Sequence, residues 1–444
     1  MLAVCLLGAG SADTARASGW EPARQITPPG QTVATFSSDI GPKGLTAIAW
    51  TVSMPPTRGT SYRARVFAKI RLPGKDRFGP KRFLGIAGPG YVTAAIGGRG
   101  LTVLSWPDPS NHLRVLTRSV DGTWTKAQRI SAGKAHGAII DVGVDGTTIL
   151  LSSWAAEGSS RQKIQVATRN RNTGRFSPWI KASQDPGSVG FDADVVAGVN
   201  GEGTVVWAGP CPVGSAARNA SYVDMSGLMV TSPKTIPNSK CVPWDLDLQI
   251  DNAGRQYFRI GGSKYMWNGV KLAIRQPGQP FPAMKFLSET GEFTDGGILA
   301  VSPGGRATVI WRVADNQSYH WTKYQYVTSR NGRFPSAVRE LENIRTNRHG
   351  RRDLLEGMAA LPGGKVTMLW KESRTDPDGS WRSRIGTRSW DPGTVFKRPS
   401  YQYPVAKELL AYPTLIDAAS DGSRMAMWGK DDNALMRGIN WIHP

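Results

Sequence analysis

GLTAIAW at residues 44–50 is the first of a series of stretches in which a glycine is followed six positions later by a tryptophan. The other members are GLTVLSW (100–106), GEGTVVW (201–207), GRATVIW (305–311), GKVTMLW (364–370) and GSRMAMW (422–428). With 51 glycines and 16 tryptophans in 444 residues, chance predicts about two such pairs, whereas the sequence holds seven, six of them in one register. Recurrence of this kind indicates a repeat architecture.

Two weaker copies complete a set of eight units. GTTILLSSW (146–154) lengthens the spacing by two residues, which keeps the tryptophan on the same face of a strand. GRQYFRI (254–260) has isoleucine in place of tryptophan. The eight turn glycines are spaced 46–59 residues apart and are Gly44, Gly100, Gly146, Gly201, Gly254, Gly305, Gly364 and Gly422. This spacing predicts an eight-bladed β-propeller with four-stranded antiparallel blades, or a seven-bladed one if a weak copy is not a unit.

Each unit is expected to form four short strands. The first precedes the glycine turn, as in IIDVGVDG (139–146), and the second ends at the tryptophan and is apolar on both faces, as suits burial between blades. The third alternates, as in LRVLTRS (113–119). The fourth opens with an aromatic residue and reaches an aliphatic one six or seven positions later, as from Trp124 to Ile130. RRDLLEGMAAL (351–361) is one of the rare segments compatible with a turn or two of helix.

The two ends of the chain complement each other. The segment from Trp20 to Ile26 has the spacing of a fourth strand, whereas the last unit, from about residue 405, has three strands. Residues 19–27 are therefore expected to form the outer strand of the last blade. A ring closed in this way exposes only short strand edges.

The N-terminal residues 1–17 are expected to be a signal peptide. Residues 2–10 form an apolar core, and Ala15-Arg16-Ala17 supplies a small-residue cleavage site, so residues 18–444 would form a single propeller domain. No other stretch approaches the 18 or more apolar residues of a membrane-spanning helix. We therefore expect a secreted or cell-envelope protein without a transmembrane segment.

The chain resembles the broad β-propeller superfamily over essentially all of residues 18–444. A fainter resemblance links it to sialidase-type propellers, whose third and fourth strands are joined by the Asp-box turn S-x-D-x-G-x-x-W. SVDGTW (119–124) is one residue short of that motif, and NTGRF (172–176) and RNGRF (330–334) lack its serine and aspartate. The resemblance implies the architecture and does not transfer an activity.

Loops between second and third strands share one rim of such a ring with the connections between blades. The long ones are 51–62, 208–222, 312–322 and 371–383. We call this side the long-loop rim. Long loops on a rigid scaffold commonly carry function, so binding residues are expected here.

The densest basic cluster falls in the connection between the sixth and seventh units, and it consists of Arg345, Arg348, His349, Arg351 and Arg352. Arginine forks fit carboxylate and phosphate groups, and Trp321 and Trp381 in neighbouring loops would stack on sugar rings. The competing interpretation is a solvated charged loop with aromatic residues that pack locally.

Cys211 and Cys241 fall on the same rim and are expected to form a disulfide in an exported protein. No metal site and no cofactor are expected, since the sequence lacks CxxC and HExxH motifs and its histidines are dispersed. A glycoside-active enzyme would need a pair of acidic residues, and the candidates on the rim are Glu157, Asp315, Glu372, Asp376 and Asp378.

The chain carries 55 Lys and Arg against 34 Asp and Glu, a formal net charge of +21. Such an excess favours anionic partners, although scattered basic residues also suit a merely soluble surface. We expect an exported, monomeric binding or scaffold protein whose rim engages an anionic glycan, an envelope polymer or a protein. No nucleic-acid-binding module is present. The alternative is a glycoside-active enzyme of sialidase-like architecture, with two carboxylates facing a central pocket.

Overall fold

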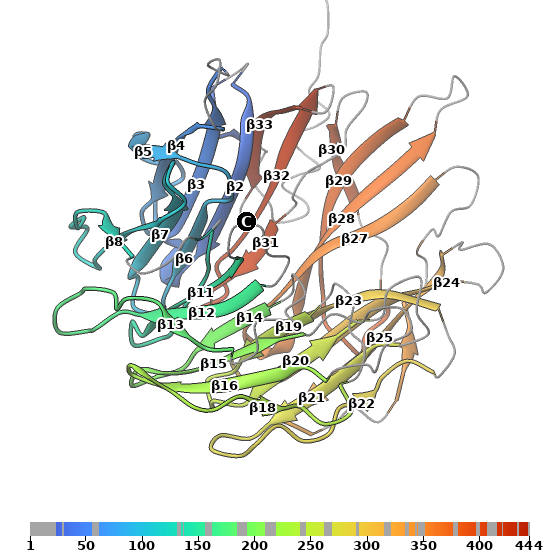
Figure 1. Ribbon diagram of the computed structural model, residues 1–444. Coiled ribbons are helices and arrows are strands. Elements are labelled where there is room, and N and C mark those ends of the chain that lie inside the picture. Colours follow the sequence, from blue (N-terminus) through green and yellow to red (C-terminus); the bar gives the residue numbers. More distant parts are fainter. Residues whose placement is uncertain are drawn as a thin grey trace, which may run out of the picture.

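The computed structural model of the chain describes the main body of the repeats. The described residues are 24–28, 31–55, 62–130, 135, 137–155, 162–183, 193–208, 219–239, 246–261, 269–289, 293–314, 321–333, 337–341, 344, 351–375, 381–396, 400–405, 415–419, 421–432 and 435–442. They form antiparallel sheets arranged radially around a common centre (Figure 1). The protein is an eight-bladed β-propeller, as the repeat predicts.

The strands of each blade follow one another in the chain from the centre outward. Blade 1 contains β2 (Val33–Ile40), β3 (Thr46–Ser53), β4 (Ala64–Arg71) and β5 (Arg82–Ala87), and blade 2 contains β6 (Thr93–Ile96), β7 (Thr102–Pro107), β8 (Leu113–Arg118) and β9 (Gln128–Arg129). Blade 3 contains β10 (Ile139–Val142), β11 (Thr148–Ala155), β12 (Gln162–Thr168) and β13 (Ile180–Lys181). Blade 4 contains β14 (Ala193–Ala197), β15 (Glu202–Trp207), β16 (Ser221–Ser226), β17 (Met229–Val230) and β18 (Lys234–Thr235). In blade 4, both β17 and β18 pair with β16.

The second half of the ring repeats this order. Blade 5 contains β19 (Leu246–Ile250), β20 (Gln256–Ile260), β21 (Lys271–Arg275) and β22 (Lys285–Phe286), and blade 6 contains β23 (Phe293–Val301), β24 (Arg306–Ala314), β25 (Trp321–Arg330) and β26 (Arg339–Glu340). Blade 7 contains β27 (Arg351–Ala360), β28 (Val366–Thr375), β29 (Trp381–Trp390) and β30 (Ser400–Val405). Blade 8 contains β31 (Leu415–Ala418), β32 (Arg424–Asp432) and β33 (Leu435–Ile442), together with β1 (Arg24–Gln25) from the N-terminal end of the described chain. Two single turns of 3-10 helix, Pro42–Gly44 and Pro362–Gly364, lie in turns between first and second strands.

The repeated glycine and tryptophan have the expected structural roles. All eight turn glycines have φ between +74° and +89°, a conformation that a side chain disfavours. The tryptophans that follow them lie on buried second strands, and Trp50, Trp311 and Trp370 are at most 1% exposed. The expectation that the strand ends at the tryptophan was wrong for these three, because β3, β24 and β28 continue past it. The side chains of Trp154 and Trp428 lie outside the described set.

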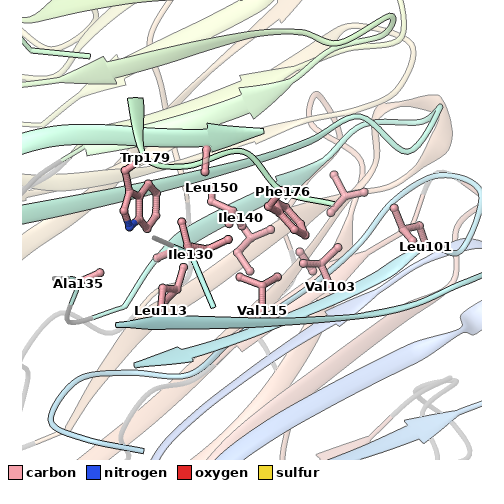
Figure 2. Close-up of a cluster of buried hydrophobic side chains, with 14 residues drawn as sticks. Leu101, Val103, Leu113, Val115, Ile130, Ala135, Ile140, Leu150, Phe176 and Trp179 are labelled. Carbon is pink, nitrogen blue, oxygen red and sulfur yellow. The ribbon is translucent and has the colours of Figure 1, made fainter. Parts of the chain in front are cut away.

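Hydrophobic clusters lie between neighbouring blades and hold the ring together. In Figure 2, Val103 and Val115 of blade 2 face Ile140 and Phe176 of blade 3 within one such cluster. Each second strand is buried on both faces because it contributes to the clusters on both of its sides.

The ring closes through the N-terminal strand, as expected. Arg24 pairs with Trp441 and Gln25 with Asn440, so β1 is the outer strand of blade 8. Ile26, directly after β1, is 4% exposed in a cluster with Met425 and Met427 of β32. Residues 1–23 lie outside the described part, so the signal peptide and the start of the domain at residue 18 stay predictions.

Two expectations about strands were wrong. The fourth strands pair over only two residues in most blades, and Trp124 makes an isolated bridge to Arg118 ahead of β9. The aromatic residue therefore belongs to the turn, while the aliphatic residue after the strand is buried. The segment 351–360 is the strand β27 and not a helical turn, because its pairing with β28 satisfies the backbone.

Candidate functional site

Five aspartates lie on the inner strands of the ring. They are Asp39 on β2, Asp141 on β10, Asp194 on β14, Asp247 on β19 and Asp417 on β31. Their residues are half-buried, and charges on different blades influence one another, as between Asp141 of blade 3 and Asp417 of blade 8. An acidic centre thus lies inside a strongly basic protein.

Four of these carboxylates join adjacent blades. Asp141 accepts a hydrogen bond from the amide of Val142 at 2.8 Å through one oxygen and from Ala197, on the inner strand of blade 4, at 2.7 Å through the other. The same arrangement, with the amide of the next residue and an amide of the neighbouring blade, recurs at Asp39, Asp194 and Asp417. Each of these four aspartates therefore accepts hydrogen bonds from inner-strand amides, which would otherwise lack a hydrogen-bond acceptor.

Enclosure by protein and mutual repulsion raise the pKa values of these carboxyl groups. The pKa of Asp39 lies well above its usual range because of burial and of Asp417, to which its carboxyl group is hydrogen-bonded. Burial raises the pKa of Asp141 to about 6. Burial and the nearby charge of Asp247 raise the pKa of Asp194 to about 8.

Acidic residues of the turns opposite the long-loop rim also bind backbone. Asp145 accepts from the amide of Thr147 at 2.9 Å and from that of Asn200, in the next blade, at 2.6 Å. Asp421 accepts from the amide of Lys43 across the junction between blades 8 and 1. These contacts lower the pKa of Asp421 despite its partial burial.

Further carboxylates are paired with arginine between or within blades. Asp251, whose side chain is fully buried, bonds Arg255 at 2.7 Å, and Asp224 of blade 4 bonds Arg275 of blade 5 at 2.6 Å. Both pairs lie near the core, where a carboxylate without a partner would be costly. These carboxylates therefore contribute to the assembly of the ring.

One carboxylate candidate of the long-loop rim has a similar partner. Glu372 lies on β28, is 1% exposed and accepts from Nε of Arg384 at 2.6 Å. It is therefore a buried ion-paired residue and not an exposed rim acid. The other candidates lie outside the described residues: Glu157, Asp315, Asp376 and Asp378.

The structure divides the predicted arginine cluster. Arg345 and Arg348 lie outside the described residues, whereas Arg351 and Arg352 are the first residues of the inner strand β27. The expectation that all four lie in a connecting loop was wrong for these two. Their strand begins earlier than expected because β28 extends to Thr375 and pairs with β27 along its length.

Trp321 and Trp381 also differ from the expected loop positions, since they begin the third strands β25 and β29. Backbone register pairs Arg351 with Arg374, and the next residue, Thr375, with Trp381. Arg351 and Trp381 are therefore brought to the same end of blade 7, and Trp321 lies in blade 6. Whether these residues bind a ligand stays a prediction.

The expected disulfide between Cys211 and Cys241 also lies outside the described residues. It would close a loop of roughly 30 residues and contribute about 3–4 kcal/mol by the loop-entropy relation. Mass mapping of exported protein is expected to find the two cysteines in one linked peptide pair. Two free thiols would contradict this prediction.

In the described part of the chain, no group of three or more His, Cys, Asp or Glu side chains is placed to hold a metal ion. The helical turns found there have neither the length nor the apolar character of a membrane-spanning helix.

No known family model matches the chain, and no curated protein matches its sequence. Among solved structures, the WD40 domain of SCAP from fission yeast is 8% identical, with 95% of this chain and 97% of that chain covered and a TM-score of 0.49. The β-propeller domain of the trilobed protease from Pyrococcus furiosus is 8% identical (83% and 99% covered, TM-score 0.44), and an ulvan lyase is 11% identical (78% and 90% covered, TM-score 0.45). Likenesses this remote carry no information on a ligand or an activity.

Proposed function

We propose that the protein is an exported binding protein that holds an anionic polymer, such as an acidic glycan of the cell envelope, on a cationic surface. The observation that carries this proposal is an unequal use of charge in the described structure. Many of its aspartates accept hydrogen bonds from backbone amides or pair with arginine, whereas many of its Lys and Arg side chains are exposed.

Many exposed basic side chains have no carboxylate partner among the described residues. They include Lys75, Arg77, Lys81, Arg82, Arg99, Lys126, Arg175, Arg339 and Lys365. Together with the formal net charge of +21, these side chains give the protein a cationic surface. Such a surface attracts polyanions over a distance comparable to the Debye length.

The central carboxylates favour binding over glycoside hydrolysis. Asp39, Asp141, Asp194 and Asp417 each engage backbone amides through both oxygens. A general acid or nucleophile must instead approach the substrate. The proposal of export depends on the signal sequence in residues 1–17.

Binding to anionic polysaccharides is expected to be strong at low salt and weak at moderate salt. The probes are polygalacturonate, which carries carboxylates, and heparin, which carries sulfates, with dextran as the neutral control. Raising the NaCl concentration from 50 to 300 mM should weaken binding at least tenfold, because salt screens exposed charges. Equal binding to dextran, or no binding to either anionic polymer at 50 mM, would contradict the proposed function.

A further inference from the structure

An open groove runs along the outer side of blade 1 where it meets blade 2. It consists of two adjoining hollows of about 410 and 420 Å³, within the range of ligand pockets. The two share Ile70, Leu72 and Gly79 and therefore form one continuous depression. We call it the blade 1–2 groove, and its remaining lining residues are Ala68, Lys69, Lys75, Asp76, Arg77, Pro80, Lys81, Arg82, Arg118 and Trp124.

The lining of this groove is strongly basic. It contains six basic residues and one acidic residue, Asp76, whereas the whole chain has 55 and 34. Within the described structure, no carboxylate forms an ion pair with Lys81, Arg82 or Arg118, nor with Lys75 and Arg77 in the turn. The groove thus concentrates uncompensated positive charge.

Aromatic rings and backbone hold some of these cations in place. The guanidinium of Arg82 lies 4.9 Å from the centre of the Trp124 ring, and Nζ of Lys81 lies 4.6 Å from that of Phe67. Lys69 donates to the carbonyl oxygen of Ile26 at 2.8 Å. Partial burial and the charge of Lys81 lower the pKa of Lys69, which indicates that the cations repel one another.

The wall from blade 2 is built by a well-defined turn. Its residues resemble an Asp box, and Asp121 accepts from the amide of Thr123 at 3.0 Å while Ser119 Oγ donates to the carbonyl oxygen of Thr123 at 3.0 Å. This turn positions Arg118 and Trp124, which flank it and pair with each other through their backbones. The carboxylate of Asp121 is engaged inside the turn, where the hydroxyl of Ser119 is the main cause of its lowered pKa.

We propose that the blade 1–2 groove is the site that binds the anionic polysaccharide, an inference that depends on the proposed function. Carboxylate or sulfate groups would contact Lys81, Arg82 and Arg118. Leu72, which is 44% exposed, would offer apolar surface to the sugar rings. Because the groove is open along its length, it accommodates a segment of a longer chain. This places the ligand on the outer wall of the propeller, away from the arginine cluster of the long-loop rim.

The test compares three variants of the full chain that remove positive charge at different places. The groove variant is Lys75→Gln, Lys81→Gln and Arg118→Gln. The matched control, Arg175→Gln, Arg339→Gln and Lys365→Gln, removes the same charge from exposed sites on blades 3, 6 and 7. The rim variant replaces Arg345, Arg348, Arg351 and Arg352 by glutamine.

Affinity for polygalacturonate and heparin at 50 mM NaCl is measured, with thermal unfolding as a check on folding. The groove variant is expected to bind at least tenfold more weakly than the parent, and the control variant within about threefold of it. Equal losses of affinity in the groove and control variants, or a loss of affinity confined to the rim variant, would contradict the groove as the binding site. Either result would leave the proposed function standing. No binding by the parent would instead overturn the proposed function.

A competition experiment tests the class of ligand. Single-stranded DNA presents a similar linear charge without exposed pyranose rings. It is expected to displace polygalacturonate from the parent at least tenfold less effectively than heparin does, when compared at equal charge concentration. Equal displacement would overturn the assignment to a polysaccharide.

Discussion

Deleting residues 24–27 is expected to lower the free energy of unfolding by more than about 4 kcal/mol, because it removes the outer strand of blade 8 and part of the contact between blades 8 and 1. The deletion removes the pairing of Arg24 and Gln25 with β33 and the buried side chain of Ile26. It also removes the carbonyl group of Ile26 that accepts from Lys69 of blade 1. Urea unfolding of the parent and the deletion variant measures the difference.

A single substitution tests the same prediction if the deletion variant does not fold. Ile26→Ala is expected to cost about 2–5 kcal/mol, as is typical for buried isoleucine. Val120→Ala is the matched control, since Val120 is 66% exposed and its truncation should change stability by less than about 0.5 kcal/mol. An unchanged urea midpoint for Ile26→Ala would show that β1 does not close the ring.

Raising the pH from 5 to 8 is expected to reduce stability through the central aspartates. Their folded-state pKa values are raised, to about 6 for Asp141 and about 8 for Asp194, above an unfolded value near 3.9. The stabilisation is therefore complete below about pH 4 and is lost as the pH rises through these folded-state values. Each group contributes a slope of up to about 1.4 kcal/mol per pH unit in its window.

The window from pH 5 to 8 separates this effect from opposite contributions. Carboxylates with lowered pKa values, such as Asp108, Asp224 and Asp421, contribute stability that is lost only at more acidic pH. Asp194→Asn is expected to flatten the pH dependence of unfolding, even if it costs stability at pH 5 by weakening one amide bond. Glu340→Gln, at an exposed position, should leave the profile unchanged. A parent profile that rises from pH 5 to 8, or one that Asp194→Asn does not alter, would contradict the account.

The blades could be predicted from the sequence because each repeat pairs a glycine with a large apolar residue, and few other residues can take their structural roles. A glycine such as Gly305 supplies the positive φ of the turn, and a tryptophan such as Trp311 fills the space between blades. The outer strands of most blades are shorter than the sequence predicts, because a strand at the edge of a blade needs few backbone hydrogen bonds to its neighbour. In blade 2, Trp124 packs against the core from a turn, and only Gln128 and Arg129 continue the sheet.

The site was harder to predict because it depends on contacts between blades. In units 1, 3 and 8 an aspartate lies five positions before the turn glycine, and this pattern is visible once the units are aligned. The partners of these aspartates in the neighbouring blades are not visible in the sequence. The blade 1–2 groove combines Lys81 and Arg82 with Arg118 and Trp124, which are about 40 residues apart and form no charge run. Charge density along the sequence therefore indicates the arginines near residue 350 and not the groove.

The most direct test of the central claim is a crystal structure of the protein with a hexamer of galacturonate. The account predicts that the sugar lies in the blade 1–2 groove, with carboxylates within hydrogen-bond distance of Lys81 and Arg118 and a sugar ring against Leu72. Binding of the oligosaccharide on the long-loop rim or at the acidic centre of the ring, with the groove empty, would contradict it.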